Sequence, residues 1–342
     1  MIDRALSSKI SNMGVVCAIL VVLLHICPRA EVGSLTWCCD RFFNDGIGRA
    51  AVPFFFSISG FFLARHIDED GWWGRAICGR LGTLLVPYLI WNCLWLIMPL
   101  VLDGPTNLLK GQSVFSNIDV SEFMRVGQPF VLPPLGPTWY IRTLLLFVVL
   151  SPLFVAMLRY NAKMTLAVSF LLYVMLYRSE SVPFGTWRAM GNTPFALEGL
   201  VYFLIGIKLA MENKPRDISR IHALVIFSVA LIFTVVRIYC KARGHVVVYN
   251  HTRFLVVPGF LLMLWKIAPS CVWPKWITSS AFAIYLIHPF AIFLFRKCVD
   301  ERIEGPIHYF LCASLAVFVP IAFKLILSKT SERLSSIVFG GR

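Results

Sequence analysis

Charged residues are scarce in this sequence, and their scarcity excludes an ordinary soluble protein. Only 15% of the 342 residues are charged and 58% are hydrophobic, whereas soluble domains usually carry about 25% charged residues. The mean hydropathy of +0.74 agrees with a chain whose main solvent is lipid. No Lys/Arg run of the kind found in nucleic-acid tails occurs. We therefore interpret the net charge of +14 as loop and lipid-headgroup charge and expect no nucleic-acid partner.

Two further signals are missing: a cleavable export signal and a metal-ligand motif. The apolar run Met13–Ile26 follows Lys9, but no small-x-small cleavage site comes after it, so we take the run as the first membrane helix. The ten cysteines include no CxxC pair and no Cys/His ligand spacing, so we expect no metal site. The vicinal Cys38 and Cys39, near Cys27, could form a disulfide if the compartment is oxidising.

Long apolar runs, by contrast, are abundant. A helix needs about 20 mostly apolar residues to span a membrane. Runs near that length are Ile10–Cys27, Ile47–Ala64, Gly82–Leu102, Trp139–Leu158, Pro194–Met211, Ile221–Tyr239, Thr252–Ala268, Ser279–Phe295 and Ile307–Leu327, and Thr165–Tyr177 is shorter but aromatic and uncharged. We therefore predict an all-α, polytopic transmembrane helix bundle of about ten helices, forming a single domain over residues 1–342, with both termini on one side.

The distribution of basic residues gives a preferred orientation. Lys and Arg are slightly more frequent in the loops that lie inside when the N-terminus is inside. We therefore predict a protein of the cell inner membrane with cytoplasmic termini. The longest loop, Asp103–Pro137, then lies outside. Its prolines and glycine exclude a folded domain but allow a lid over a site.

The second span is rich in small residues. Pro53 interrupts the helical hydrogen-bond ladder, and Ser57, Ser59 and Gly60 allow either another helix or a ligand chain to come close. Helix packing is the commoner use of small residues in a span.

Ionisable side chains at membrane depth are costly and usually face the bundle interior or a wet cavity. His25 lies roughly 23 Å along a helix from Ile10. An imidazole there can act as a general base or carry a group covalently, and a histidine hydrogen-bonded at a helix end is the competing interpretation. Tyr285 and His288 share a helix face beside Pro289 and form the second intramembrane candidate site.

The other polar groups each have two interpretations. Trp139 and Arg142, three residues apart, could bind a sugar, with its ring stacked on the indole and its oxygens bound by the guanidinium. Equally, Trp139 could be an aromatic anchor at the membrane interface and Arg142 a snorkelling arginine. Glu198 could be catalytic or form a structural ion pair with a basic residue of the bundle. Arg75 and Arg80 could clamp the phosphates of a nucleotide-type donor, or serve as cytoplasmic anchors.

Several segments, in their order and spacing, resemble the acyltransferase-3 family of membrane O-acyltransferases. They are Val21–His25, Ala51–Phe61, the basic loop followed by Leu84–Trp91, Trp139–Arg142 and Ile284–Pro289. The resemblance runs from the first span to the last. It implies a ten-helix protein that moves an acyl group, usually acetyl or succinyl, from a cytosolic coenzyme A thioester to a hydroxyl of an extracytoplasmic glycan.

One departure from the family pattern concerns the first helix. Many members carry an arginine ten or eleven residues before the essential histidine, where this chain has Gly14 and Val15. Either a subgroup does without that arginine, or Lys9 or Arg49 supplies the charge, or the chain is impaired.

We therefore predict a membrane-embedded O-acyltransferase with acyl-CoA, most simply acetyl-CoA, as co-substrate, no bound cofactor, and a glycan or lipid-linked sugar as acceptor. By the resemblance, His25 is the essential histidine, and we expect it to deprotonate the sugar hydroxyl or to accept the acyl group transiently. We predict His288 as the second catalytic residue, which would hold the acceptor or the developing oxyanion. The remaining predicted site residues are Arg75 and Arg80 for acyl-CoA, and Arg49, Trp139, Arg142 and Tyr285 for the acceptor or the developing oxyanion.

Two other classes of function use the same polar groups. A transporter or flippase for a lipid-linked glycan would line a passage with them, and would often show two related halves with broken helices, which are not visible here. A binding module would sense or capture a ligand without chemistry, and would usually carry a soluble output domain.

Overall fold

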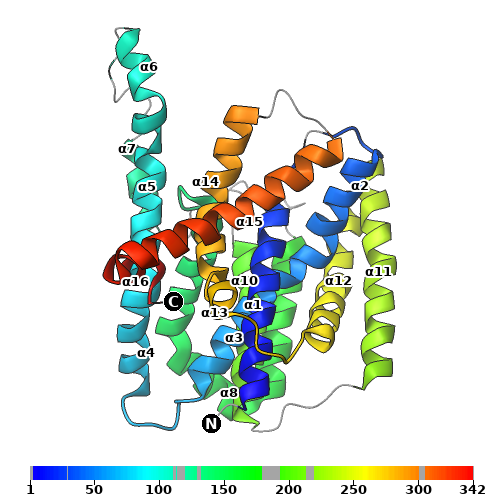
Figure 1. The fold of residues 1–342 in the computed structure, drawn as a ribbon. Coiled ribbons are helices and arrows are strands. Elements are labelled where there is room, and N and C mark those ends of the chain that lie inside the picture. The colour runs from blue at the N-terminus through cyan, green and yellow to red at the C-terminus, as the bar shows by residue number, and fades with distance from the viewer. Residues whose placement is uncertain are drawn as a thin grey trace.

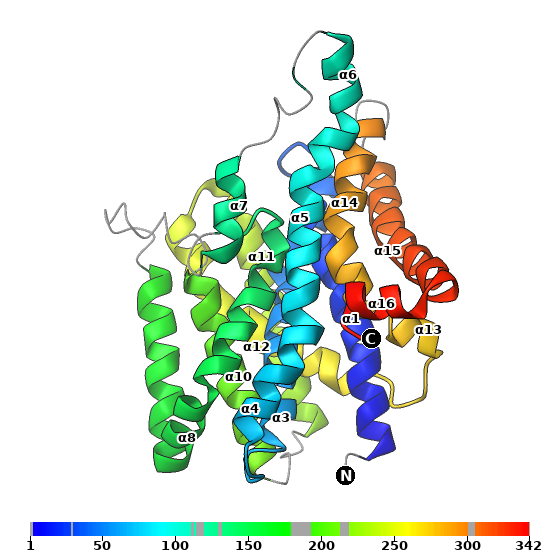
Figure 2. The same ribbon diagram turned by 90° about the vertical axis from the view of Figure 1, so that its left-hand side faces the viewer.

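The computed structural model describes residues 3–28, 30–110, 113, 120–128, 132–178, 193–212, 219–299 and 305–341. Within these ranges every regular element is a helix, and no strand occurs. The long helices run side by side, and in the view of Figure 1 α1 stands between α5 at one edge and α11 at the other, while Figure 2 shows the α8 and α5 side. The prediction of an all-α transmembrane bundle is confirmed.

The elements in chain order are α1 Arg4–His25, α2 Leu35–Arg41, η1 Phe42–Gly46, η2 Ile47–Ala50, α3 Ala51–Ala64, α4 Trp72–Arg80, η3 Leu81–Leu85, α5 Val86–Leu102, α6 Gly104–Leu109, α7 Val120–Gly127, η4 Gly136–Thr138, α8 Trp139–Arg178, α10 Thr193–Met211, α11 Arg220–Arg243, α12 Val246–Ile267, α13 Lys275–Thr278, α14 Ala281–Val299, α15 Gly305–Thr330 and α16 Glu332–Phe339.

Seven segments of the described chain are long and apolar enough to cross a membrane. They are Arg4–His25, Leu35–Ala64, Trp72–Leu109, Gly136–Met175, Arg220–Arg243, Ala281–Val299 and Gly305–Thr330. α10 packs beside them against α3 and α8, and α12 packs against α11. Because the segment Gly136–Met175 holds two helices, the predicted count of about ten spans remains approximate.

The longest helix, α8, consists of two helices that meet at Asn161. The backbone of Asn161, with φ −155° and ψ 96°, leaves the helical region. Its side-chain oxygen accepts a hydrogen bond of 3.0 Å from the N–H of Met164, so it caps the second helix. The two halves match the separate apolar runs Trp139–Leu158 and Thr165–Tyr177 of the sequence.

Helical regularity is broken between α2 and α3. The chain stays helical from Leu35 to Ala64, but Phe42–Gly46 is a π-helical turn and Ile47–Ala50 is a 3₁₀ turn. Pro53 lies in the first turn of α3, where its missing N–H removes no intrahelical hydrogen bond. The interruption that the sequence suggested at Pro53 therefore lies just before it. Irregular turns of this kind often occur at functional sites.

α3 and α10 approach closely through two glycines. A Cβ added to Gly60 would collide with the carbonyl oxygen of Phe203, and a Cβ added to Gly206 would collide with the carbonyl oxygen of Ser57. The small residues of the second span therefore serve helix packing.

Gly206→Ala should destabilise the bundle by about 1–3 kcal/mol, because the new methyl group cannot fit without separating two helices. The expected result is a lower melting temperature of the purified protein in detergent. Gly79→Ala is the matched control, since a Cβ there meets nothing within 4 Å. Equal melting temperatures for the two variants would contradict the close approach.

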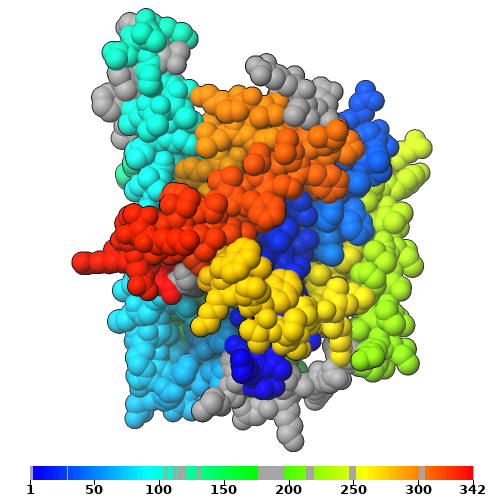
Figure 3. Space-filling view, in the orientation of Figure 1, coloured from blue at the N-terminus to red at the C-terminus, as the bar shows by residue number. Residues whose placement is uncertain are grey.

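Aromatic rings fill the space between α3, α8 and α10. The ring of Phe147 lies 5.5 Å from that of Phe56 and 5.4 Å from that of Phe203. On another face, α15 runs obliquely across the bundle and covers part of α1, and α16 continues toward α5 (Figures 1 and 3). The core around α1 is therefore enclosed by helices from both halves of the chain.

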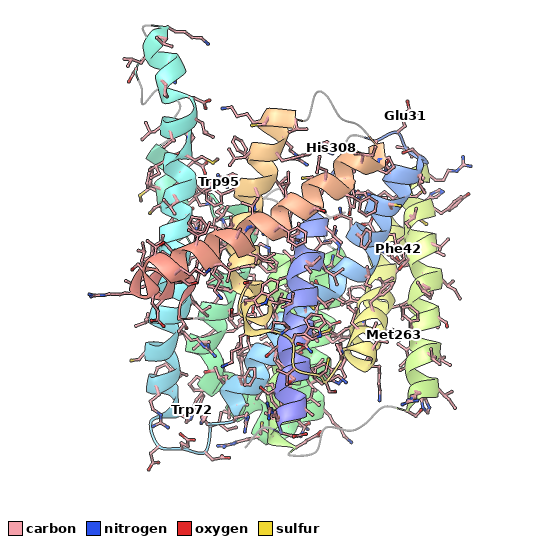
Figure 4. The ribbon with its side chains drawn as sticks, in the orientation of Figure 1. Glu31, Phe42, Trp72, Trp95, Met263 and His308 are labelled. Atoms are coloured by element: carbon pink, nitrogen blue, oxygen red, sulfur yellow. The ribbon has the colours of Figure 1, made fainter. Side chains whose placement is uncertain are left out.

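The bundle has two ends, which we name for the residues of α1. We call the end at which α1 begins the N-terminal end. We call the opposite end, toward which α1 runs and ends at His25, the His25 end. In Figure 4, Trp72 at the start of α4 lies at the N-terminal end, and Glu31, which follows α1, lies at the His25 end.

Candidate functional site

His25 is the last residue of α1, and a backbone hydrogen bond orients its ring. Nδ1 lies 2.8 Å from the carbonyl oxygen of Val21. Because a carbonyl only accepts hydrogen bonds, Nδ1 must donate, and a neutral ring then carries its lone pair on Nε2. The side chain is exposed, so a ligand can reach the ring.

His288 faces His25 from α14. The two ring centroids are 5.1 Å apart with an angle of 54° between the planes, so His25 is turned toward another helix of the bundle. His288 is fully buried, and its Nδ1 lies 3.1 Å from the carbonyl oxygen of Ile284. This contact again makes Nδ1 the donor. Its Nε2 is buried without a hydrogen-bond partner, and is therefore an acceptor directed into the bundle.

Two tyrosines continue from the histidine pair into the bundle. The ring of Tyr285 lies 6.4 Å from that of His288 and 5.9 Å from that of Tyr140 on α8. The hydroxyl of Tyr285 donates a 2.6 Å hydrogen bond to the carbonyl oxygen of Pro137. The hydroxyl of Tyr140 lies 3.3 Å from the hydroxyl of Ser59 on α3. Tyr140 was not identified from the sequence, although it is the neighbour of Trp139.

A buried asparagine on α5 fixes the segment that precedes α8. Asn92 is fully buried, accepts a 3.0 Å hydrogen bond from the N–H of Leu135, and donates a 3.0 Å bond to the hydroxyl of Thr138. This segment carries the carbonyl oxygen of Pro137 that receives the Tyr285 hydroxyl. Asn92 does not contact the histidine pair, but it holds in place the segment whose Pro137 carbonyl binds Tyr285.

Trp139 and Arg142 lie in different surroundings. The indole of Trp139 packs 6.2 Å from the ring of Phe56 on α3. Arg142 Nη1 donates a 2.6 Å hydrogen bond to the carbonyl oxygen of Gln128, directly after α7, and Tyr88 donates a 2.6 Å bond to Val126 within α7. Arg142 thus lies where α7, one of the described parts of the predicted lid, meets the bundle.

Arg49 lies in the 3₁₀ turn before α3, beside the end of α1. A Cβ on Gly48 would meet the side chain of Leu24, so this turn packs directly on the helix that ends at His25. Arg49 is near enough to His25 for their charges to interact. Lys9, the other cation considered for the missing first-helix arginine, lies over the ring of Trp265, roughly 24 Å from His25 by helical rise.

Arg75 and Arg80 lie on α4, whose start is at the N-terminal end. Arg75 Nη2 is 2.7 Å from Glu69 Oε2, and Nη1 donates a 2.5 Å hydrogen bond to the carbonyl oxygen of Asp70. The hydrogen bond from His66 lowers the pKa of the Glu69 carboxyl, so Glu69 is ionised at neutral pH and stays paired with Arg75. Arg80 ends the helix and lies on a different face from Arg75.

The deep charges of the bundle include Glu198, which the sequence singled out, and Arg253, Arg237 and Lys324, which were missed. Glu198 of α10 forms a buried ion pair with Arg253 of α12: Arg253 Nε lies 3.1 Å from Glu198 Oε1, and Nη2 binds the other oxygen. Of the two interpretations that the sequence left open for Glu198, the structure shows the ion pair. Arg237 of α11 is 1% exposed, and Lys324 of α15 donates to the carbonyl oxygen of Ser279.

Another missed residue, Arg296 of α14, caps the end of α1. Its Nη2 donates to the carbonyl oxygens of Ile26 and Cys27, the latter at 3.1 Å. The last carbonyls of a helix have no intrahelical donor, so this guanidinium supplies one immediately after His25.

The segment after α1 holds three cysteines. Cys27, Cys38 and Cys39 are all free, and the Cys38 thiol lies 3.8 Å from the carbonyl oxygen of Gly33. The disulfide that the sequence allowed is not formed in this structure.

Comparison with known proteins gives one match. A protein-family model described as an acyltransferase domain matches residues 10–325, nearly the whole chain. No curated protein and no solved structure matches the chain. The matched range begins within α1 and ends within α15, and so contains every residue of the site described above.

Proposed function

The chain belongs to the acyltransferase-3 family, and from this premise we propose that it is a membrane O-acyltransferase that moves an acyl group from acyl-CoA to a hydroxyl of a cell-envelope glycan. The observation that carries the proposal is the histidine pair, in which an exposed imidazole on α1 faces a buried imidazole on α14. The acceptor would bind at the His25 end, outside the cell, and acyl-CoA would enter from the cytoplasmic, N-terminal end. The acyl group is proposed to be acetyl.

His25 acts as the general base. Its Nε2 takes the proton of the acceptor hydroxyl while the hydroxyl oxygen bonds to the thioester carbonyl carbon. The bond between that carbon and sulfur then breaks, and the proton on His25 passes to the coenzyme A thiolate. The hydrogen bond from Nδ1 to Val21 keeps the reactive nitrogen directed away from the helix.

His288 assists as a hydrogen-bond acceptor. Because its Nδ1 donates to Ile284, Nε2 carries a lone pair and cannot donate to an oxyanion. Nε2 of His288 can instead accept a hydrogen bond from the N–H of a protonated His25. This bond would stabilise the imidazolium formed during proton transfer. This role fits the buried, unpartnered Nε2 better than the oxyanion role expected from the sequence.

The donor is proposed to bind through Arg75 and Arg80 at the opposite end. Arginine forks suit the phosphates of a coenzyme A molecule. Two separate ends agree with a reaction whose donor and acceptor lie on different sides of a membrane. Trp139, Arg142 and Tyr285 remain proposed acceptor contacts, and the Tyr285 hydroxyl is already engaged by Pro137.

Mass spectrometry of envelope glycans from cells with and without this chain tests the proposal. We expect the loss of one acyl group, most simply acetyl, from one glycan. The purified protein should also transfer radiolabelled acetyl from acetyl-CoA to that glycan. An unchanged acyl pattern across all glycans would contradict the proposal and favour a transporter.

Arg296 is proposed as a positioning residue, because it caps the helix end that carries His25. Arg296→Met should lower kcat about tenfold, with little change in KM, since the base becomes less well placed. Arg296→Lys keeps a donor and should recover part of kcat, which a purely structural loss would not do. Steady-state kinetics of the purified variants measures both. A parallel fall in melting temperature and kcat, without recovery by lysine, would contradict the positioning role.

A further inference from the structure

A lysine that the proposed mechanism does not use is enclosed by the bundle. Lys324 of α15 is 6% exposed, and its ammonium group donates one hydrogen bond, to the carbonyl oxygen of Ser279. No carboxylate of the described residues forms an ion pair with it. An ammonium group has three donors, so two of them remain for a ligand. A charge of this kind within a span is costly and usually marks a functional site.

The side chain of Lys324 points into the bundle and not toward the membrane surface. A lysine six residues before the end of α15 at Thr330 could snorkel to that surface. Its neighbours Phe323 and Ile326, however, are the exposed residues, and they form the outer face of the helix. Ser279, which accepts the hydrogen bond from Lys324, lies on the inner side between α13 and α14. The ammonium group is therefore held at the start of α14.

This position adjoins a packed layer that three helices share. One hydrophobic cluster supplies its buried residues: Ala18 of α1, Ile284 of α14 and Ile321 of α15. α15 begins at the His25 end, where Figure 4 labels His308, and runs obliquely away from that end, whereas α1 and α14 run toward it (Figure 1). About one turn of each helix toward the N-terminal end therefore leads to Gly14, Ser280 and Lys324.

Open space borders this second layer. A Cβ added to Gly14 would meet no atom of the described residues within 4 Å. Eleven residues, about three helical turns, separate Gly14 from His25, so both lie on one face of α1. A ligand can therefore be accommodated beside Lys324, on the face of α1 that carries the proposed base.

The depth of Lys324 matches the length of an acyl-CoA arm. Ser279 precedes His288 by nine residues, roughly 14 Å of helical rise, and the ring of His288 faces that of His25. The chain of about 13 bonds between the sulfur and the first phosphorus of coenzyme A corresponds to about four peptide residues and spans at most about 15 Å. With the thioester at His25, the diphosphate would therefore lie at the level of Lys324.

We propose that Lys324 binds the diphosphate of acyl-CoA at the inner end of the pantetheine arm. This inference rests on the proposed function and adds a donor-binding residue to it. One ammonium N–H stays on Ser279 and fixes the side chain, and the others contact phosphate oxygens. Arg75 and Arg80 of α4 bind the 3′-phosphate of the same donor. A phospholipid headgroup offers the same phosphate oxygens and is the competing source.

Binding of coenzyme A to the purified protein, measured by isothermal titration, gives the first test. Lys324→Met should raise the Kd for coenzyme A about tenfold, because two charge-assisted hydrogen bonds are lost. Lys324→Arg should retain most of the affinity. Lys329→Met, a change at an exposed lysine of the same helix, is the matched control. Equal Kd values for the wild type and Lys324→Met would overturn this inference and leave the proposed function intact. Absence of binding to the wild type would overturn the proposed function itself.

A donor without phosphates separates binding from a structural role. Lys324→Met should raise the KM for acetyl-CoA and leave the KM for S-acetylpantetheine unchanged. The melting temperature should not fall, because an apolar side chain of similar size in place of a buried charge is often neutral for stability. A lower melting temperature with an equal loss of transfer from both donors would show that Lys324 only holds α15 against Ser279, and would overturn the proposal.

The lipid alternative is distinguished by native mass spectrometry of the same variants. Loss of bound anionic phospholipid in Lys324→Met, with unchanged binding of coenzyme A, would show that the lysine holds a headgroup and would overturn the proposal. Unchanged lipid binding with weaker binding of coenzyme A supports it.

Discussion

Alanine in place of His25 should lower the kcat of acyl transfer by about a hundredfold or more. A positioned general base contributes typically 10²–10⁴-fold to a rate, and in this structure the only ring facing His25 in the described contacts is His288, which is buried. The KM for acyl-CoA should change little, because its phosphates are proposed to bind on α4 at the other end. Steady-state kinetics with purified protein and labelled acetyl-CoA measures both constants.

A matched control separates chemistry from folding. His222 is an exposed histidine near the start of α11, where it interacts with the Ser219 cap, so His222→Ala should retain wild-type turnover. Because His25 is itself exposed, His25→Ala should keep a melting temperature close to that of the wild type. Retained turnover in the His25 variant would remove this residue from the mechanism.

Local sequence patterns predicted each histidine but not their contact. His25 was predicted because it is a polar residue at the end of an apolar run. His288 was predicted because it shares a helix face with Tyr285. Their contact joins residues 263 positions apart. Helical periodicity predicts the face of a helix on which a residue lies, but it does not predict which other helix packs against that face. The roles of Tyr140 and Asn92 depend on the same tertiary contacts, so neither was identified.

The burial of Asp45, in the turns between α2 and α3, was missed for a different physical reason. An apolar run beginning at Ile47 placed Asp45 in a loop, whereas the π-helical and 3₁₀ turns carry it into the bundle. These turns depend on the packing of Gly46 against α11, which no local pattern records. Arg237 lies near the end of an apolar run, where an arginine side chain can reach the membrane surface, so its position in the sequence does not indicate burial. Its burial follows from the carbonyl oxygen of Asp45 that it binds.

The ion pair between α10 and α12 should have the largest effect on stability. Glu198→Leu leaves the buried guanidinium of Arg253 without its carboxylate, and removal of one partner from a buried pair costs about 3–5 kcal/mol. We expect the midpoint of unfolding in detergent titrated with dodecyl sulfate to fall strongly. The reciprocal change, Arg253→Leu, should have a similar effect, since it leaves Glu198 as a buried unpaired anion.

The double variant Glu198→Leu/Arg253→Leu tests whether the two charges stabilise the bundle only by neutralising each other. Both charges are then absent, no desolvated ion remains, and leucine fits an apolar bundle, so most of the lost stability should return. The control is Glu122→Leu in α7, whose partner Arg125 is about one-third exposed, and which should cost less than about 1 kcal/mol. A double variant as unstable as the sum of the single ones would mean that each charge has separate essential partners. In that case the pair would belong to a functional polar network rather than to the scaffold that holds α3 and α10 against the active site.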